Sequence, residues 1–167
     1  MNKKVVTRYC LFVVVLLLLI IIPITYASAP GSQLISQFTM PASKNTALLS
    51  YSFFSEPASG TLKFHELFSP NGSDAYLAIP VESKTGVVEV RLQFDNQYVT
   101  AYFPQSGDRI LQIDRKSLNC CSLYSFTIKD GQLTVTIGTK SNTVDGISAF
   151  TGTFASQSVS GKAAVYK

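Results

Sequence analysis

The sequence has few of the residues on which most enzymes and metal sites depend. It contains no tryptophan, one histidine (His65), three cysteines and only 14% charged residues. It has no glycine-rich phosphate loop, zinc-ligand spacing, calcium-binding loop or serine–histidine–aspartate ordering. Its carboxylates are scattered singly, which provides no pair for acid–base catalysis. These absences predict a protein that binds rather than catalyses, with no catalytic residue, no cofactor and no bound metal.

The chain also has little net charge once its first residues are set aside. Its 14 basic residues exceed its 10 acidic ones, but Lys3, Lys4 and Arg8 account for most of that excess. Residues 30–167 are therefore nearly neutral. This balance argues against nucleic acid as a partner, because nucleic-acid binding depends on basic patches.

One long hydrophobic run, residues 10–22, follows this cationic start. Pro23 and a small-residue segment ending at Ala29 come next, so residues 1–29 have the three parts of a secretory signal peptide. A membrane span needs about 20 apolar residues, and residues 10–26 come close enough that an uncleaved anchor is the alternative. In both cases the cations keep the N-terminus inside. We expect residues 30–167 to be secreted or extracytoplasmic, at a cell surface or in a periplasm.

The rest of the chain has the composition and periodicity of an all-β protein. It is rich in Ser, Thr, Val, Phe and Tyr, and its short alternating runs are separated by Gly, Pro, Asn and Asp clusters. We predict a leader at residues 30–46 and a single domain at residues 47–167. The expected fold is an antiparallel β-sandwich of about ten strands, with a small β-barrel as the alternative. Expected strands cover residues 33–38, 47–54, 61–68, 75–81, 87–94, 109–114, 124–129, 132–137, 146–154 and 162–166. The strand that pairs with residues 87–94 in a hairpin is one more.

Two hairpins can be aligned residue by residue. If Asp95-Asn96 is a two-residue turn, the apolar side chains on either side coincide: Leu92 with Val99, Val90 with Ala101 and Val88 with Phe103. In the second hairpin Asp130-Gly131 is a strong type I′ signal, since glycine tolerates positive φ. That turn sets Ile128 opposite Leu133, Phe126 opposite Val135 and Tyr124 opposite Ile137.

The cysteines do not form the framework of a small disulfide-rich protein. Cys10 lies in the hydrophobic run, so Cys120 and Cys121 are the two that remain, and they are adjacent. Extending the alternation back from Tyr124 predicts a buried Cys120 and an exposed Cys121. A disulfide between neighbours is the alternative; it would be strained, because a trans peptide holds the two Cα atoms about 3.8 Å apart.

Two further residues can be interpreted from their local sequence. His65 alternates with Thr61 and Lys63, which predicts a solvent-exposed strand residue rather than a base or metal ligand. Asn71-Gly72-Ser73 is an N-glycosylation sequon in a turn-rich segment, so Asn71 is a glycosylation site if the host modifies secreted proteins.

The register that buries Val90 and Leu92 turns a set of polar and aromatic residues outward. Four of them form our candidate ligand site: Arg91, Gln93, Tyr98 and Tyr102. Two exposed tyrosines about 13 Å apart along a strand form a platform for sugar rings or a peptide. The alternative is that a second sheet or a loop covers them. We therefore predict a secreted binding module for carbohydrate or protein, with an apolar-molecule carrier and an edge-strand assembly subunit as alternatives.

Overall fold

The computed structural model describes residues 32–41, 48–69 and 75–167, and strands make up most of them. Thirteen strands occur in these ranges, with one short 3₁₀ helix, η1 (Arg115–Ser117). The strands are β1 (Leu34–Met40), β2 (Leu48–Ser52), β3 (Gly60–Phe68), β4 (Ala75–Ser83), β5 (Gly86–Phe94), β6 (Tyr98–Tyr102), β7 (Arg109–Asp114), β8 (Tyr124–Lys129), β9 (Gln132–Ile137), β10 (Lys140–Asp145), β11 (Ile147–Phe150), β12 (Thr153–Gln157) and β13 (Ser160–Tyr166).

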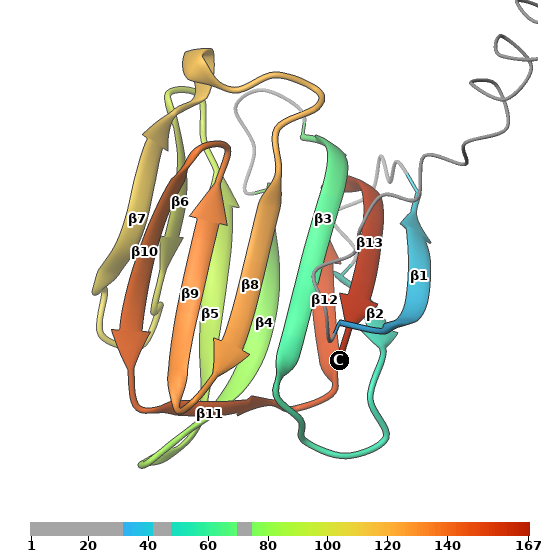
Figure 1. Cartoon of the computed structure of the whole chain (residues 1–167). Coiled ribbons are helices and arrows are strands. Elements are labelled where there is room, and N and C mark those ends of the chain that lie inside the picture. The colour runs from blue at the N-terminus through green and yellow to red at the C-terminus, as the bar shows by residue number, and fades with distance from the viewer. Residues whose placement is uncertain (1–31, 42–47, 70–74) are drawn as a thin grey trace, which may run out of the picture. The chain divides into compact units, whose positions relative to one another are not determined.

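The strands form two antiparallel sheets that face each other, as Figure 1 shows. Sheet A has the order β1-β13-β3-β8-β9-β10. Sheet B has the order β2-β12-β4-β5-β6-β7, and β11 pairs with β4 outside that path. The predicted antiparallel β-sandwich is confirmed in the form of a jelly-roll-like fold. The alternative of a single closed barrel is wrong, because no strand pairing joins the two sheets within the described residues.

The second predicted hairpin, β8–β9, is confirmed residue by residue. Ile128 lies opposite Leu133, Phe126 opposite Val135 and Tyr124 opposite Ile137. Both turn residues have positive φ, 52° at Asp130 and 76° at Gly131, as a type I′ turn requires. Turn chemistry and hydrophobic pattern agree here, so a purely local interpretation sufficed.

The first predicted hairpin, β5–β6, has the right faces but the wrong register. Leu92 lies opposite Ala101 instead of Val99. The turn begins one residue later than expected, because Asp95 and Tyr98 pair across it: the Asp95 N–H donates to the Tyr98 carbonyl at 3.0 Å, and the Asp95 carboxylate accepts from the Tyr98 N–H at 2.5 Å. The resulting slip is two residues, which leaves every side chain on its predicted face.

The remaining strand predictions need smaller corrections. The structure has thirteen strands in its described part instead of about ten. Residues 146–154 do not form one strand, because Gly146 (φ 82°) and Gly152 (φ 90°) separate β10, β11 and β12. The chain there leaves sheet A at β10 and enters sheet B at β11. Strand β10 was missed because most of its side chains are exposed and its sequence does not alternate.

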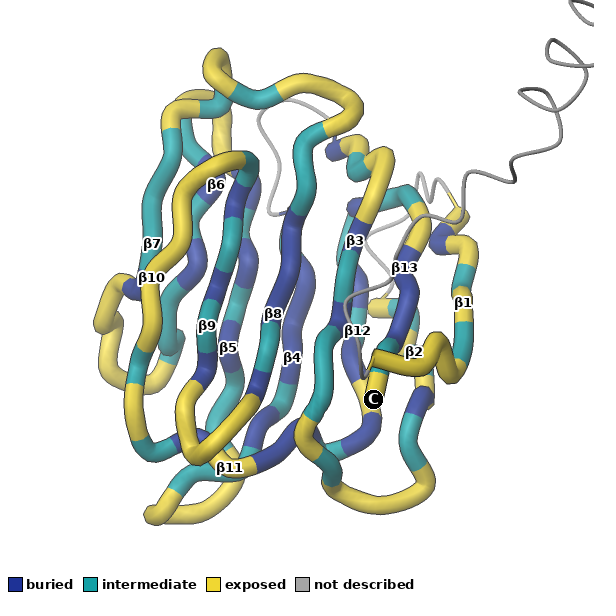
Figure 2. The backbone as a smooth tube through the Cα atoms, viewed as in Figure 1, coloured by how far each residue is buried: buried dark blue, intermediate teal, exposed yellow. Residues whose placement is uncertain are grey.

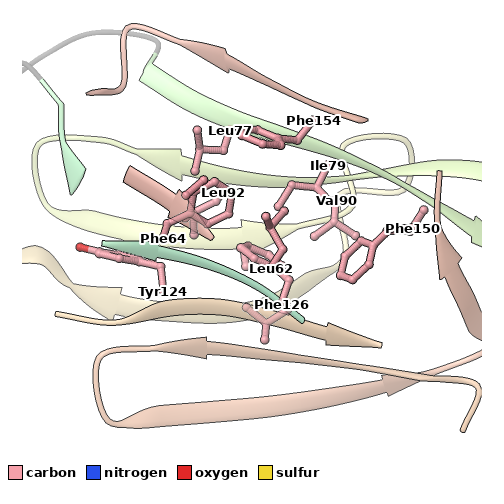
Figure 3. Packing of buried hydrophobic residues seen from close by; sticks show 14 of the residues in the cluster. Leu62, Phe64, Leu77, Ile79, Val90, Leu92, Tyr124, Phe126, Phe150 and Phe154 are labelled. Atoms are coloured by element: carbon pink, nitrogen blue, oxygen red, sulfur yellow. The ribbon is translucent and has the colours of Figure 1, made fainter. Parts of the chain in front are cut away.

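The core lies between the two sheets. Buried residues alternate with half-buried or exposed ones along the central strands (Figure 2), and the buried side chains of both sheets interdigitate (Figure 3). Phe154 on β12 is a centre of this packing, with ring centroids 5.3 Å from Phe64, 4.9 Å from Tyr51, 6.0 Å from Phe53 and 6.1 Å from Phe38. It therefore joins strands of sheet B to β1 and β3 of sheet A.

The two sheets also meet at one lateral edge. The Asn142 side chain on β10 donates a 2.7 Å hydrogen bond from Nδ2 to the Ile110 carbonyl on β7. These are the last strands of sheets A and B on that side. An edge carbonyl is thereby satisfied by the opposite sheet rather than left open.

Several predictions fall outside the described residues. The signal or anchor segment at residues 1–29 and the sequon residue Asn71 belong to this group. Strand β1 lies within the predicted leader and pairs with β13. In the described ranges, no helix has the length and hydrophobicity needed to cross a bilayer.

Candidate functional site

The outward side of sheet B carries a continuous set of polar and aromatic side chains. Strand alternation places them there, because the residues between them, such as Val90, Leu92 and Val99, are buried against sheet A. We call this set the outer face of sheet B. Its members are all half-buried: Tyr76, Glu89, Arg91, Gln93, Tyr98, Thr100, Tyr102 and Gln112.

Arg91 lies near the centre of this outer face. Its guanidinium carbon is 4.3 Å from the centroid of the Tyr76 ring on β4, a cation–π contact. Its Nε donates to Glu89 Oε1 at 2.7 Å, and its Nη2 also lies 2.7 Å from the same oxygen. Partial burial opposes the charge of Arg91, but the hydrogen bond and charge of Glu89 raise the Arg91 pKa above its ordinary value. The arrangement is a fixed, permanently charged planar donor.

Cross-strand hydrogen bonds order the neighbouring side chains. The Tyr102 hydroxyl on β6 donates to Gln93 Oε1 on β5 at 2.8 Å. Further along, Gln112 Nε2 donates to Thr100 Oγ1 at 3.2 Å, and Arg109 Nη1 donates to Gln112 Oε1 at 2.8 Å. Amide groups held in this way present donors and acceptors in fixed directions.

The four predicted ligand-site residues all lie on this outer face. Arg91 is opposite Tyr102 in the strand register, and Gln93 is bonded to Tyr102. Tyr98 lies at the other end of β6, opposite Asp114. Sheet A packs against the other side of sheet B, so it does not cover the tyrosines.

Sequence reasoning missed the contribution of β4. Tyr76 stacks with Arg91, yet it was not among the predicted site residues. Two signals could have identified it: Tyr76 alternates with Ala75 and Leu77, which are buried, and residues 83–86 form a tight turn that pairs β4 with β5. That pairing places Tyr76 opposite Gln93.

A recess lies over sheet A, where β1, β3 and β13 meet the η1–β8 connection. Its volume is about 710 Å³, and we call it the cysteine groove. The residues that line it are Gln37, Phe38, Thr39, His65, Glu66, Cys120, Cys121, Lys162, Ala163 and Ala164. His65 is exposed on the outward side of β3 as predicted. That it shares a recess with the cysteines does not follow from any local pattern.

The predicted burial of Cys120 is wrong, since both Cys120 and Cys121 are exposed. The alternation of β8 begins at Tyr124 and does not extend back to the cysteines, because residues 119–122 form a turn in which the Ser122 N–H donates to the Asn119 carbonyl at 3.1 Å. The two sulfurs are free thiols 3.5 Å apart.

One glutamate on the outer face of sheet B and one beside the cysteine groove are engaged in ion pairs. Glu89 pairs with Arg91, and Glu66 on the rim of the cysteine groove pairs with Lys162 at 2.7 Å. Within the described part of the chain, no three His, Cys, Asp or Glu side chains gather closely enough to hold a metal ion.

Comparison with known proteins identifies the fold and no family. No protein-family model matches the sequence, and a search of curated proteins finds no match. Among solved structures, a Crh5 transglycosylase in complex with NAG has a TM-score of 0.52 and 11% identity, covering 81% of this chain and 77% of that one. The Caenorhabditis elegans galectin LEC-6 has a TM-score of 0.45 and 14% identity, covering 78% and 95%. The carbohydrate-binding module CBM66 from Bacillus subtilis has a TM-score of 0.41 and 12% identity, covering 82% and 92%.

Proposed function

We propose that this protein is a non-catalytic, extracytoplasmic carbohydrate-binding module, and that a saccharide binds on the outer face of sheet B. The observation that carries the proposal is the Tyr76–Arg91–Glu89 stack beside the Tyr102–Gln93 pair. A sugar presents apolar C–H faces and a rim of hydroxyls. Half-exposed aromatic rings can pack against the C–H faces, and ordered guanidinium and amide groups can form hydrogen bonds with the hydroxyls.

The dimensions of this surface favour an oligosaccharide over a single sugar ring. Tyr98 and Tyr102 are four residues apart on β6, about 13 Å at ~3.3 Å per residue. Gln93 and Thr100 lie between them in the register. A chain of several sugar units running along β6 would contact both tyrosines and the amides together. The shared fold with a transglycosylase whose solved structure contains NAG is in keeping with this ligand class.

The non-catalytic part of the proposal rests on the number of carboxyl groups on the outer face. Glycoside hydrolysis requires two carboxyl groups, one of which gives up or accepts a proton at the glycosidic bond. Glu89 is the carboxylate nearest the centre of the outer face, and its Oε1 accepts from Arg91. Glu89 is also the one carboxyl group among the residues that make up the outer face, so the second carboxyl group that hydrolysis requires is missing from this set.

The extracytoplasmic part rests on sequence alone. It is based on the cationic start and the apolar run at residues 10–22. Fractionation of the native host and N-terminal sequencing of the mature protein would test it. A mature protein found in the cytoplasm would contradict it.

The binding proposal is tested on a glycan array of neutral and amino-sugar oligosaccharides, followed by calorimetry with the best-bound one. The Tyr98→Ser/Tyr102→Ser double variant should bind at least tenfold more weakly, about 1.4 kcal/mol or more, with little change in unfolding midpoint. Tyr166→Ser is the matched control, because Tyr166 is a half-buried tyrosine in a cation–π contact with Lys63 on sheet A.

Three results would contradict the proposal. They are an array with no bound saccharide, equal loss of binding in the control variant, and gross unfolding of the double variant. The release of new reducing ends from the bound saccharide would overturn its non-catalytic part alone.

A further inference from the structure

The turn at residues 119–122 holds two adjacent cysteines in a braced position. The Cys121 N–H donates to Asn119 Oδ1 at 2.9 Å, and the Asn119 N–H donates to Ser122 Oγ at 2.9 Å. A Ser122 N–H to Asn119 carbonyl bond of 3.1 Å closes the turn. The cysteines therefore occupy its two central positions, and both are exposed on the rim of the cysteine groove.

The two thiols are close enough to react with each other. Their sulfurs are 3.5 Å apart, whereas a disulfide bond is about 2.05 Å long. Closing that difference requires rotation of two exposed side chains and adjustment of a surface turn, without any movement of the core. Proximity of this kind makes the second step of an exchange reaction effectively unimolecular.

We propose that Cys120 and Cys121 form a thiol–disulfide exchange site that closes reversibly to a disulfide between adjacent residues and thereby reshapes the cysteine groove. The co-reactant is a small soluble disulfide of the glutathione class. One thiolate attacks it, forms a mixed disulfide and releases one small thiolate. The neighbouring thiolate then attacks the protein sulfur of that mixed disulfide and releases the second. Two cysteine protons are lost, and one small disulfide is reduced to two thiols.

The geometry gives each sulfur a partner for the second step. The thiolate is the attacking species, and both cysteines are exposed to an external disulfide. Whichever sulfur forms the mixed disulfide, the other lies 3.5 Å away and resolves it.

Another residue that lines the groove provides a reporter for closure. His65 is the single histidine in the chain and lines the same groove as the cysteines. The imidazole signals in a nuclear magnetic resonance spectrum therefore all belong to His65. A change in the turn should shift those signals.

The experiment equilibrates the purified chain with mixtures of reduced and oxidised glutathione and blocks free thiols with iodoacetamide. The tryptic peptide 117–129 contains both cysteines and excludes Cys10, since Lys116 and Lys129 are its cleavage sites. It should carry two alkyl groups after reduction and none after oxidation, with two hydrogens fewer than the dithiol. Excess reduced glutathione should reverse this, because a strained disulfide is easily reduced.

Variants then test the need for both sulfurs and the coupling to the groove. Cys121→Ser and Cys120→Ser should each stop at a glutathione adduct on the remaining cysteine, because the thiol that resolves the mixed disulfide is missing. The His65 signals should move on oxidation of the native chain and stay fixed in the Cys120→Ser/Cys121→Ser double variant, whose fold is checked by circular dichroism.

The outcomes separate cleanly. A peptide that keeps both free thiols under the most oxidising mixture, or one that carries two glutathiones, would overturn the exchange site. Single variants that form no glutathione adduct would overturn the mixed-disulfide step. A closed disulfide with unmoved His65 signals would overturn the coupling to the groove. None of these results depends on saccharide binding, which we assign to the other sheet.

Discussion

Replacement of Phe154 by alanine should destabilise the protein strongly. The loss of stability should be much larger than the loss caused by removing a phenyl ring from the surface of the sandwich. Phe154 is 1% exposed, and four aromatic rings surround it with centroids within 6.1 Å. Truncation of a buried phenylalanine typically costs about 3–5 kcal/mol through lost burial and the cavity that remains. A domain of ordinary stability has about 5–15 kcal/mol in total, so the variant should fold but unfold readily.

Phe68→Ala is the matched control, because its ring is 67% exposed and its loss should change stability by no more than about 0.5 kcal/mol. Urea unfolding followed by circular dichroism and tyrosine fluorescence suits a chain without tryptophan. With a slope of about 2 kcal/mol per molar urea, the midpoint of Phe154→Ala should fall by roughly 1.5–2.5 M. A loss below about 1 kcal/mol, or one equal to that of Phe68→Ala, would refute the packing argument.

Two further perturbations follow from backbone geometry and titration. Gly152→Ala places a Cβ 2.5 Å from the Phe54 carbonyl oxygen at a φ of 90°. Backbone strain at such a φ costs about 1–3 kcal/mol, and the clash should make the loss of stability in Gly152→Ala larger than that. Gly131→Ala, with φ 76° and no atom within 4 Å of the added carbon, should lose stability through the strain alone. Equal thermal midpoints for the two variants would contradict this. Burial raises the pKa of the Tyr124 phenol, against the opposing charge of Arg115. The protonated phenol therefore contributes its full stabilisation of the folded state below pH ~10, and this stabilisation is lost as the pH rises through the raised pKa of the folded state. Native protein should thus lose stability above pH ~10 more steeply than Tyr124→Phe, and parallel urea midpoints across that range would contradict the assignment.

The parts of the fold that were predictable are those fixed by neighbours in sequence. Hairpin β8–β9 was predicted completely because the turn at Asp130-Gly131 and the alternation on each side give the same register. In β5–β6 the Asp95 carboxylate binds a backbone N–H beyond the expected turn, and no pattern of apolar residues reveals that bond. The prediction of which side chains point outward was still correct, because a two-residue slip preserves side-chain direction.

The candidate sites also differ in how far they could be predicted from neighbouring residues in the sequence. The positions of Arg91 and Tyr102 on one face could be read from strand alternation, since their strands are consecutive in the chain. The cysteine groove could not, because it assembles β1, β3, β13 and the turn at Cys120 from four distant parts of the sequence. Such long-range proximity depends on the order of strands in a sheet, which alternation does not encode.

The order of strands in the two sheets bears on how this chain acquires its structure during synthesis. Within the described pairings, β1 bonds only to β13, and β2 bonds only to β12. Ribosomes add about 5–20 residues per second, so the first two strands wait on the order of ten seconds for partners that emerge more than a hundred residues later. Until then β3 and β4 also lack one neighbour each. The fold is thus completed late and nearly at once, and an elongating chain presents open strand edges to any chaperone or translocation machinery that accompanies it.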